Sequence, residues 1–237
     1  KGHHYRRRRH DNCTKQSDTM SGKTILASVL TLLFFLTASA PVWAHQPYFE
    51  EDDFTAAAPY TVADPTVSTA VYATLESRGD VDYYVFDGRE GQAILLELTI
   101  PQIDGQENFT PTLALIGAGL PRIALPKAVD QPSGSGALIL RADPGPASVF
   151  NEPFSGTSYW DRQSTRATLP ADGRYTVAVW NEAGDVGRYT FVIGDREIFG
   201  GDRGFARKIR EYWTPVTLIE PTETPVTQPT YSGCGGK

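Results

Sequence analysis

Cysteine and histidine are scarce in this chain of 237 residues, and their scarcity argues against several classes of site. Two cysteines, Cys13 and Cys234, cannot build a scaffold held together by several disulfides. Of the four histidines, only His45 lies beyond residue 10. A serine or cysteine nucleophile usually needs a histidine base, so this inventory argues against a Ser-His-Asp or Cys-His site.

Basic residues are also few, since 22 Lys and Arg stand against 28 Asp and Glu for a formal net charge of −6. Binding to nucleic acid depends on clusters of Lys and Arg, so nucleic acid is not an expected partner. The 22 glycines and 17 prolines exclude a coiled coil, because helix interiors tolerate neither residue well. The 11% of aromatic residues favours strands, and the 40% of hydrophobic residues is typical of a globular domain.

The N-terminal segment is typical of an exported protein. Residues 20–44 begin at the single methionine, carry one lysine and an apolar run over 25–36, and end in small residues at Ala44, as in a secretory signal peptide. The apolar run falls short of the roughly 20 residues that span a bilayer. Residues 1–19 are interpreted as upstream read-through or a remnant of cloning. We therefore expect a product beginning at His45 that is secreted, periplasmic or on the cell surface, without membrane insertion after cleavage.

Removal of this segment changes the charge balance. Residues 1–44 contain seven of the basic residues and two of the acidic ones, so the remainder has 15 bases, 26 acids and a formal charge of −11. This charge makes nucleic acid and anionic lipid poor partners and favours a neutral or cationic polymeric ligand.

Alternation of apolar and polar residues predicts strands from residue 66 onward. The strand candidates are 67–75, 80–87, 92–100, 112–116, 137–141, 175–180 and 189–193. Clusters of Gly, Pro, Asn and Asp separate them. We expect two hairpins, which join 80–87 to 92–100 and 175–180 to 189–193. Strands with one apolar face each are buried when two sheets pack face to face.

The predicted fold is therefore all-β, an antiparallel β-sandwich over residues 66–200. Its expected core comprises Leu96, Leu98, Leu113, Leu115, Val177 and Phe191. Residues 45–65 are acidic, lack periodicity and are expected to form a leader segment. A short helix at 201–213, with Asp202 as its N-cap, is expected to dock on the sandwich. The Pro- and Thr-rich residues 214–237 predict a disordered tail.

Several short motifs resemble the bacterial pre-peptidase C-terminal domain. They are Gly-Asp-Val-Asp-Tyr-Tyr-Val-Phe at 79–86, Gly-Gln at 91–92, Pro-Thr-Leu-Ala-Leu at 111–115, Leu-Pro-Ala-Asp-Gly-Arg-Tyr-Thr-Val at 169–177 and Gly-Arg-Tyr-Thr-Phe at 187–191. The resemblance covers residues 66–193 and implies a secreted, jelly-roll-like β-sandwich with a non-catalytic accessory or binding role. Residues 117–166 depart from the family pattern, because this stretch is longer than its counterpart there.

Carboxylates indicate one candidate metal site. Asp80 and Asp82 lie close together at the start of a predicted strand, and the acidic run at 50–53 offers further oxygen ligands for calcium. The competing interpretation, which we favour, is that these Asp side chains cap a turn. Only two carboxylates have the close spacing, whereas calcium takes about six to eight oxygen ligands. Copper binding at His45 is disfavoured because no second imidazole follows it. No other cofactor is expected.

Aromatic residues indicate one candidate ligand site. Phe154, Tyr159 and Trp160 lie close together among carboxylates, and Trp180 points away from the expected core if Val179 points into it. Exposed rings beside polar groups suit the apolar faces and hydroxyls of sugars. In the alternative interpretation the rings pack the long stretch at 117–166 against the sheet.

The predicted function is a non-catalytic, exported binding or accessory module that recognises carbohydrate or a cell-wall polymer, or docks to an exported protein. Two alternatives stay open: a structural surface domain stabilised by calcium, and a hydrolase that acts through carboxylates alone.

Overall fold

The computed structural model describes residues 45–143, 145–152, 156–198 and 200–216. The chain divides into two units, residues 1–42 and 43–237, and the first lies outside the described residues. The predicted signal peptide, Phe154, and residues 217–237 of the predicted tail also lie outside them. No helix in the described part of the chain is long and apolar enough to cross a membrane.

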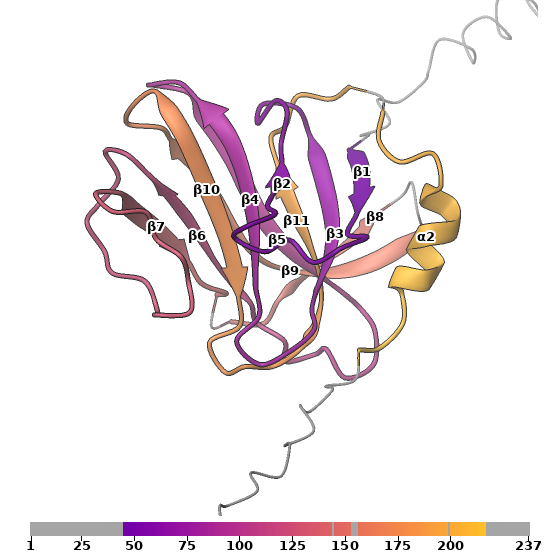
Figure 1. The fold of residues 1–237 in the computed structure, drawn as a ribbon. Coiled ribbons are helices and arrows are strands. Elements are labelled where there is room, and N and C mark those ends of the chain that lie inside the picture. The colour runs from indigo at the N-terminus through magenta and orange to yellow at the C-terminus, as the bar shows by residue number, and fades with distance from the viewer. Residues whose placement is uncertain (1–44, 144, 153–155, 199, 217–237) are drawn as a thin grey trace, which may run out of the picture. The chain divides into compact units, whose positions relative to one another are not determined.

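Two β-sheets make up the described domain (Figure 1). The six-stranded sheet contains, in spatial order, β1 (Gln46–Phe49), β3 (Thr69–Leu75), β11 (Gly187–Ile193), β5 (Ala93–Pro101), β9 (Thr157–Thr168) and β8 (Ser148–Glu152). The five-stranded sheet contains β2 (Tyr60–Thr61), β4 (Val81–Gly88), β10 (Gly173–Trp180), β6 (Thr112–Gly117) and β7 (Gly136–Leu140). The predicted all-β sandwich is confirmed.

The core lies between the two sheets, because alternate residues of each strand point to the same face. Leu96 and Leu98 of β5 and Phe191 of β11 pack in one cluster with side chains of β6 and β10. All six predicted core residues belong to this cluster and are at most 1% exposed. Burial of each such side chain stabilises the fold by about 1.5–3 kcal/mol.

The two predicted hairpins are wrong. Strand β4 pairs with β2 and β10, whereas β5 pairs with β11 and β9 in the other sheet. Strands β10 and β11 likewise lie in different sheets, since β10 pairs with β4 and β11 pairs with β3. The apolar faces of the two strands in each predicted pair therefore meet across the core. The alternation of apolar and polar residues fits this connection between the sheets as well as it fits a hairpin within one sheet.

The predicted leader segment belongs to the sandwich. Strand β1 pairs in parallel with β3, and β2 pairs in parallel with β4, so residues 45–65 extend both sheets and make them mixed. The long stretch at 117–166 likewise contributes β7, β8 and most of β9, of which β8 and β9 were not expected as strands. Each of these strands lies at or next to a sheet edge.

The predicted helix is present as α2 (Phe205–Tyr212) and docks on the outer face of the six-stranded sheet. Phe205, Ile209 and Tyr212 are buried there in one cluster with side chains of β3 and β11. The predicted N-cap is wrong, because Gly204 occupies that position and no side chain caps the helix. The Asp202 carboxylate instead lies 2.9 Å from Lys208 Nζ.

Candidate functional site

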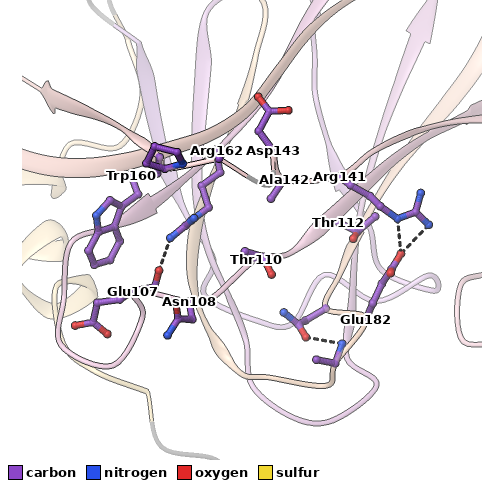
Figure 2. Close-up of a pocket in the computed structure, with 15 residues that line it drawn as sticks. Glu107, Asn108, Thr110, Thr112, Arg141, Ala142, Asp143, Trp160, Arg162 and Glu182 are labelled. Atoms are coloured by element: carbon purple, nitrogen blue, oxygen red, sulfur yellow. Dashed lines mark hydrogen bonds and ion pairs between the residues drawn. The ribbon is translucent and has the colours of Figure 1, made fainter.

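A polar cleft of about 780 Å³ opens where several strands begin or end. Its walls are formed by Glu107, Asn108 and Thr110, Thr112 at the start of β6, residues 141–143 and 145–147 after β7, Trp160 and Arg162 of β9, and residues 181–183 after β10. Figure 2 shows Trp160 and Arg162 on one side of this space and the Arg141–Glu182 pair on the other. The polar cleft therefore brings together side chains that are distant in the sequence.

A β-bulge positions Arg162 in the polar cleft. Leu98 of β5 lies opposite Gln163, but the next residue, Thr99, lies opposite Asp161, so Arg162 is the extra residue on β9. A bulge turns a side chain away from the regular alternation and bends the strand. The neighbouring Gln163 is buried, and its amide donates to the Pro111 and Leu140 carbonyls at 2.9 and 3.2 Å.

Trp160 and Arg162 form one wall of the polar cleft. The Trp160 ring is half-buried and packs against the main core, and the Arg162 guanidinium lies 6.0 Å from the ring centroid. One terminal nitrogen of Arg162 donates to the Glu107 carbonyl (Figure 2). The Arg162 Nε is buried and has no hydrogen-bond partner among the described residues.

The opposite wall is held by a surface ion pair and a turn. Arg141 Nη2 lies 2.9 Å from Glu182 Oε1, and the two side chains are 59% and 46% exposed. Asn181 Oδ1 accepts hydrogen bonds from the backbone N–H groups of Ala183 and Asp185 at 2.9 and 3.0 Å, which fixes the turn that carries Glu182. This wall offers both donors and acceptors to a ligand.

A carboxylate cluster, composed of Glu50, Asp53 and Asp82, lies elsewhere in the domain. One oxygen from each residue lies within 4.8 Å of the others. Glu50 accepts a hydrogen bond from the Thr74 N–H at 2.8 Å. Asp82 Oδ2 accepts from the Tyr189 hydroxyl at 2.6 Å, whereas Asp82 Oδ1 is buried without a partner among the described residues.

The electrostatics of the carboxylate cluster favour bound protons or a bound cation. Burial, followed by repulsion from Glu50, raises the pKa of Asp82 to about 9. Burial likewise raises the pKa of Glu50 to about 8, against the hydrogen bonds from the Thr74 and Phe54 backbone. Taking a carboxylate out of water penalises its charged form unless positive charge compensates it. Oxygen ligands of this kind suit calcium.

The two predicted calcium residues are placed differently. Asp82 belongs to the carboxylate cluster, with Glu50 and Asp53 from the acidic run that was expected to supply oxygens. Asp80 lies outside that group of three, and its Oδ2 accepts a hydrogen bond from the Glu76 N–H at 2.7 Å. This contact is of the turn-capping kind considered for both residues.

The predicted aromatic site contains three residues that the structure describes, and of these three Trp160 alone lines the polar cleft. Tyr159 is 2% exposed and meets Trp213 edge-on with ring centroids 5.1 Å apart. Trp180 points away from the main core as expected, but it is 4% exposed and packs with Leu125 and Val129, so its ring is covered. The long stretch at 117–166 thus packs over this ring, as the alternative interpretation held.

Sequence reasoning missed most of the polar cleft. Asn108, Arg141, Asn181 and Glu182 lie next to strands in three places along the chain, and no spacing in the sequence links these places. The loop residues after the predicted strands at 137–141 and 175–180 were the available signal, because binding residues concentrate on loops held by a rigid scaffold.

Comparisons with known proteins leave the family open. No family model matches the chain, and no curated protein matches it. A periplasmic inhibitor of g-type lysozyme, PliG of Aeromonas hydrophila, is 15% identical with a TM-score of 0.33, covering 64% of this chain and 98% of that one. The pre-peptidase C-terminal domain of a Bacillus anthracis collagenase is 12% identical with a TM-score of 0.28, covering 57% and 93%.

A third solved structure is CorA, a surface-associated copper-binding protein of Methylomicrobium album BG8. It is 12% identical with a TM-score of 0.33, covering 65% of this chain and 99% of that one. Likenesses at this level assign neither a family nor a ligand. The resemblance of the short motifs to the pre-peptidase C-terminal domain therefore stays a prediction, and the β-sandwich is what the structure establishes.

Proposed function

We propose that this chain is a non-catalytic, exported binding module whose polar cleft holds a neutral carbohydrate. The observation that carries this proposal is the half-buried Trp160 ring in the wall of a cleft whose other large lining side chains carry hydrogen-bonding groups. An aromatic ring covers the apolar face of a sugar, and a few well-placed polar groups bind its hydroxyls and fix its orientation.

The charges in the polar cleft support a neutral ligand. Arg141 and Arg162 are balanced by Glu107, Asp143 and Glu182, so neither sign dominates the lining. The Arg141–Glu182 pair is solvent-exposed, and such pairs contribute only about 0–1 kcal/mol to stability. Its donors and acceptors are therefore free to bind sugar hydroxyls at little cost to the fold.

A binding role fits the polar cleft better than histidine-based hydrolysis. His45 is the one histidine among the described residues, and it lies outside the lining of the polar cleft, with its Nδ1 2.5 Å from Ser68 Oγ. Burial lowers the pKa of His45, so its neutral form is favoured. The proposal therefore assigns the polar cleft to recognition.

Replacement of Trp160 tests this proposal. Glycan and cell-wall polymer screens of the full chain are expected to retain a neutral polymer, and Trp160→Ala is expected to reduce binding at least about tenfold, because stacking on the ring is lost. Trp213→Ala is the matched control, since Trp213 is also a half-buried tryptophan but lies outside the polar cleft. Thermal melts of both variants check that the fold is kept.

Two results would contradict the proposal. One is retention of no neutral polymer by the folded chain. The other is equal loss of binding in Trp160→Ala and Trp213→Ala, since that result would report a general loss of packing rather than a ligand contact.

We propose calcium as a second ligand, at the carboxylate cluster. The supporting observation is the buried Asp82 Oδ1, which has no hydrogen-bond partner in the part of the chain that the structure describes, although Glu50 and Asp53 oxygens lie within 4.8 Å of an Asp82 oxygen. A calcium ion there would replace bound protons and connect the segment that carries Glu50 and Asp53 to strand β4. Its role would be structural, because these residues lie outside the lining of the polar cleft.

A further inference from the structure

A second cleft adjoins the polar cleft. It has a volume of about 630 Å³ and shares Arg141, Asn181, Glu182 and Ala183 with the polar cleft. Its own walls include Val81, Pro126, Ala128 and Trp180. The Arg141–Glu182 pair therefore marks the boundary between two adjoining spaces, one with Trp160 and one with Trp180 in its wall.

Each of these clefts has a buried N–H donor without an acceptor. Four buried side-chain atoms lack a hydrogen-bond partner among the described residues, and the two N–H donors are Arg162 Nε and Trp180 Nε1. Arg162 lines the polar cleft and Trp180 lines the second cleft. A buried donor left unpaired costs about 1–3 kcal/mol, and in native proteins such donors normally have a partner.

We infer that the two clefts form one continuous binding site for a linear, neutral oligosaccharide that carries carbonyl groups, such as a chain of N-acetylated sugars. The ligand crosses the Arg141–Glu182 boundary and presents acceptor oxygens on both sides of it. This inference rests on the proposed carbohydrate-binding function and goes further, since it requires an extended chain rather than a single sugar. The acidic charge of the chain disfavours an anionic polymer.

The structure favours a sugar chain over a peptide at this site. The first cleft offers exposed Asn108 and Thr110 side chains and the exposed ion pair, which suit a ligand with many hydroxyls. The second cleft adds apolar surface from Pro126 and Ala128, which suits the apolar face of a sugar ring. A peptide hot spot would instead need a large apolar anchor in a dry pocket.

A length series tests the inference. N-acetylglucosamine oligomers from the dimer to the hexamer are titrated calorimetrically into the full chain. The affinity is expected to rise about tenfold or more from dimer to hexamer, because the longer ligand reaches both clefts. Ala183→Trp, which places a bulky ring at the shared boundary, is expected to reduce the hexamer affinity to that of the dimer.

Ala57→Trp is the matched control, because Ala57 is exposed and lies outside the lining of both clefts. An affinity that does not depend on length, or a hexamer affinity that Ala183→Trp leaves unchanged, overturns the continuous site while the carbohydrate-binding function stands. Absence of binding at every length overturns the continuous site for this ligand, and retention of another neutral polymer in the screen would then still support the proposed function.

Discussion

Half-buried carboxylates make the stability of this domain depend on pH. Glu97 lies in β5 between Ser164 of β9 and Val192 of β11. Burial, followed by repulsion from Asp161, raises the pKa of Glu97 to about 7. The folded state therefore holds a proton that the unfolded chain, with an ordinary glutamate pKa near 4.5, has already released.

This difference predicts a loss of stability as the pH rises from about 4.5 to about 7, because the folded state binds more protons than the unfolded state over that range. Glu97→Gln is expected to remove the loss and to raise the free energy of unfolding at pH 8 by on the order of 1 kcal/mol, a value reduced for partial solvent screening. At pH 4 the variant and the original chain should be equally stable. Urea titrations at both pH values measure this.

Glu90→Gln is the control for the Glu97 prediction, since Glu90 is exposed in the turn before β5 and its replacement changes the net charge equally. A stability difference between Glu97→Gln and the original chain that is the same at pH 4 and pH 8 would contradict the account of Glu97.

Single residues differ in how far the sequence predicts them. Leu96 and Leu98 could be assigned to the core because alternation within one strand is a local pattern. The position of Arg162 could not be predicted, because it depends on the shift in pairing between β5 and β9, which is a property of two strands together. Trp180 was placed on the correct face, but its cover comes from residues 125 and 129, far away in the sequence.

At the scale of elements, the sequence identified most strands but not their partners. Strands β1 and β2 contain four and two residues, too few for a periodic pattern, and each is held by a parallel strand from a later part of the chain. The short turn between β4 and β5 predicts a hairpin. The two strands lie in different sheets instead, and this arrangement is favoured because it turns both of their apolar faces toward one core.

Calcium is predicted to stabilise the connection between the segment of β1 and β2 and strand β4. At a calcium concentration 100 times the dissociation constant, the gain is about 2.7 kcal/mol, or about 5–10 °C in melting temperature for a domain of this size. Asp53→Asn is expected to abolish this shift between calcium and chelator. Asp52→Asn, at an exposed neighbouring position outside the carboxylate cluster, is expected to retain it. Equal melting temperatures for the original chain with calcium and with chelator would contradict the prediction.

At the scale of the whole domain, the polar cleft is a product of topology. Strands β6, β7, β9 and β10 come from both sheets, and the residues at or near their ends meet in one lining. The sandwich could be predicted because apolar periodicity requires two facing layers. The meeting of Trp160 with Arg141 and Glu182 could not be predicted, because it depends on which strands are neighbours, and many pairings satisfy the same periodicity.

The central claim is that this meeting point binds carbohydrate. Amide chemical shifts of the nitrogen-15-labelled chain, recorded while the N-acetylglucosamine hexamer is added, test it most directly. The account predicts shifts concentrated at residues 107–110, 112, 141–143, 160–162 and 181–183, at and next to the lining of the polar cleft. Shifts concentrated instead around helix α2, or no shifts with this hexamer or with any neutral polymer retained in the screen, would contradict it.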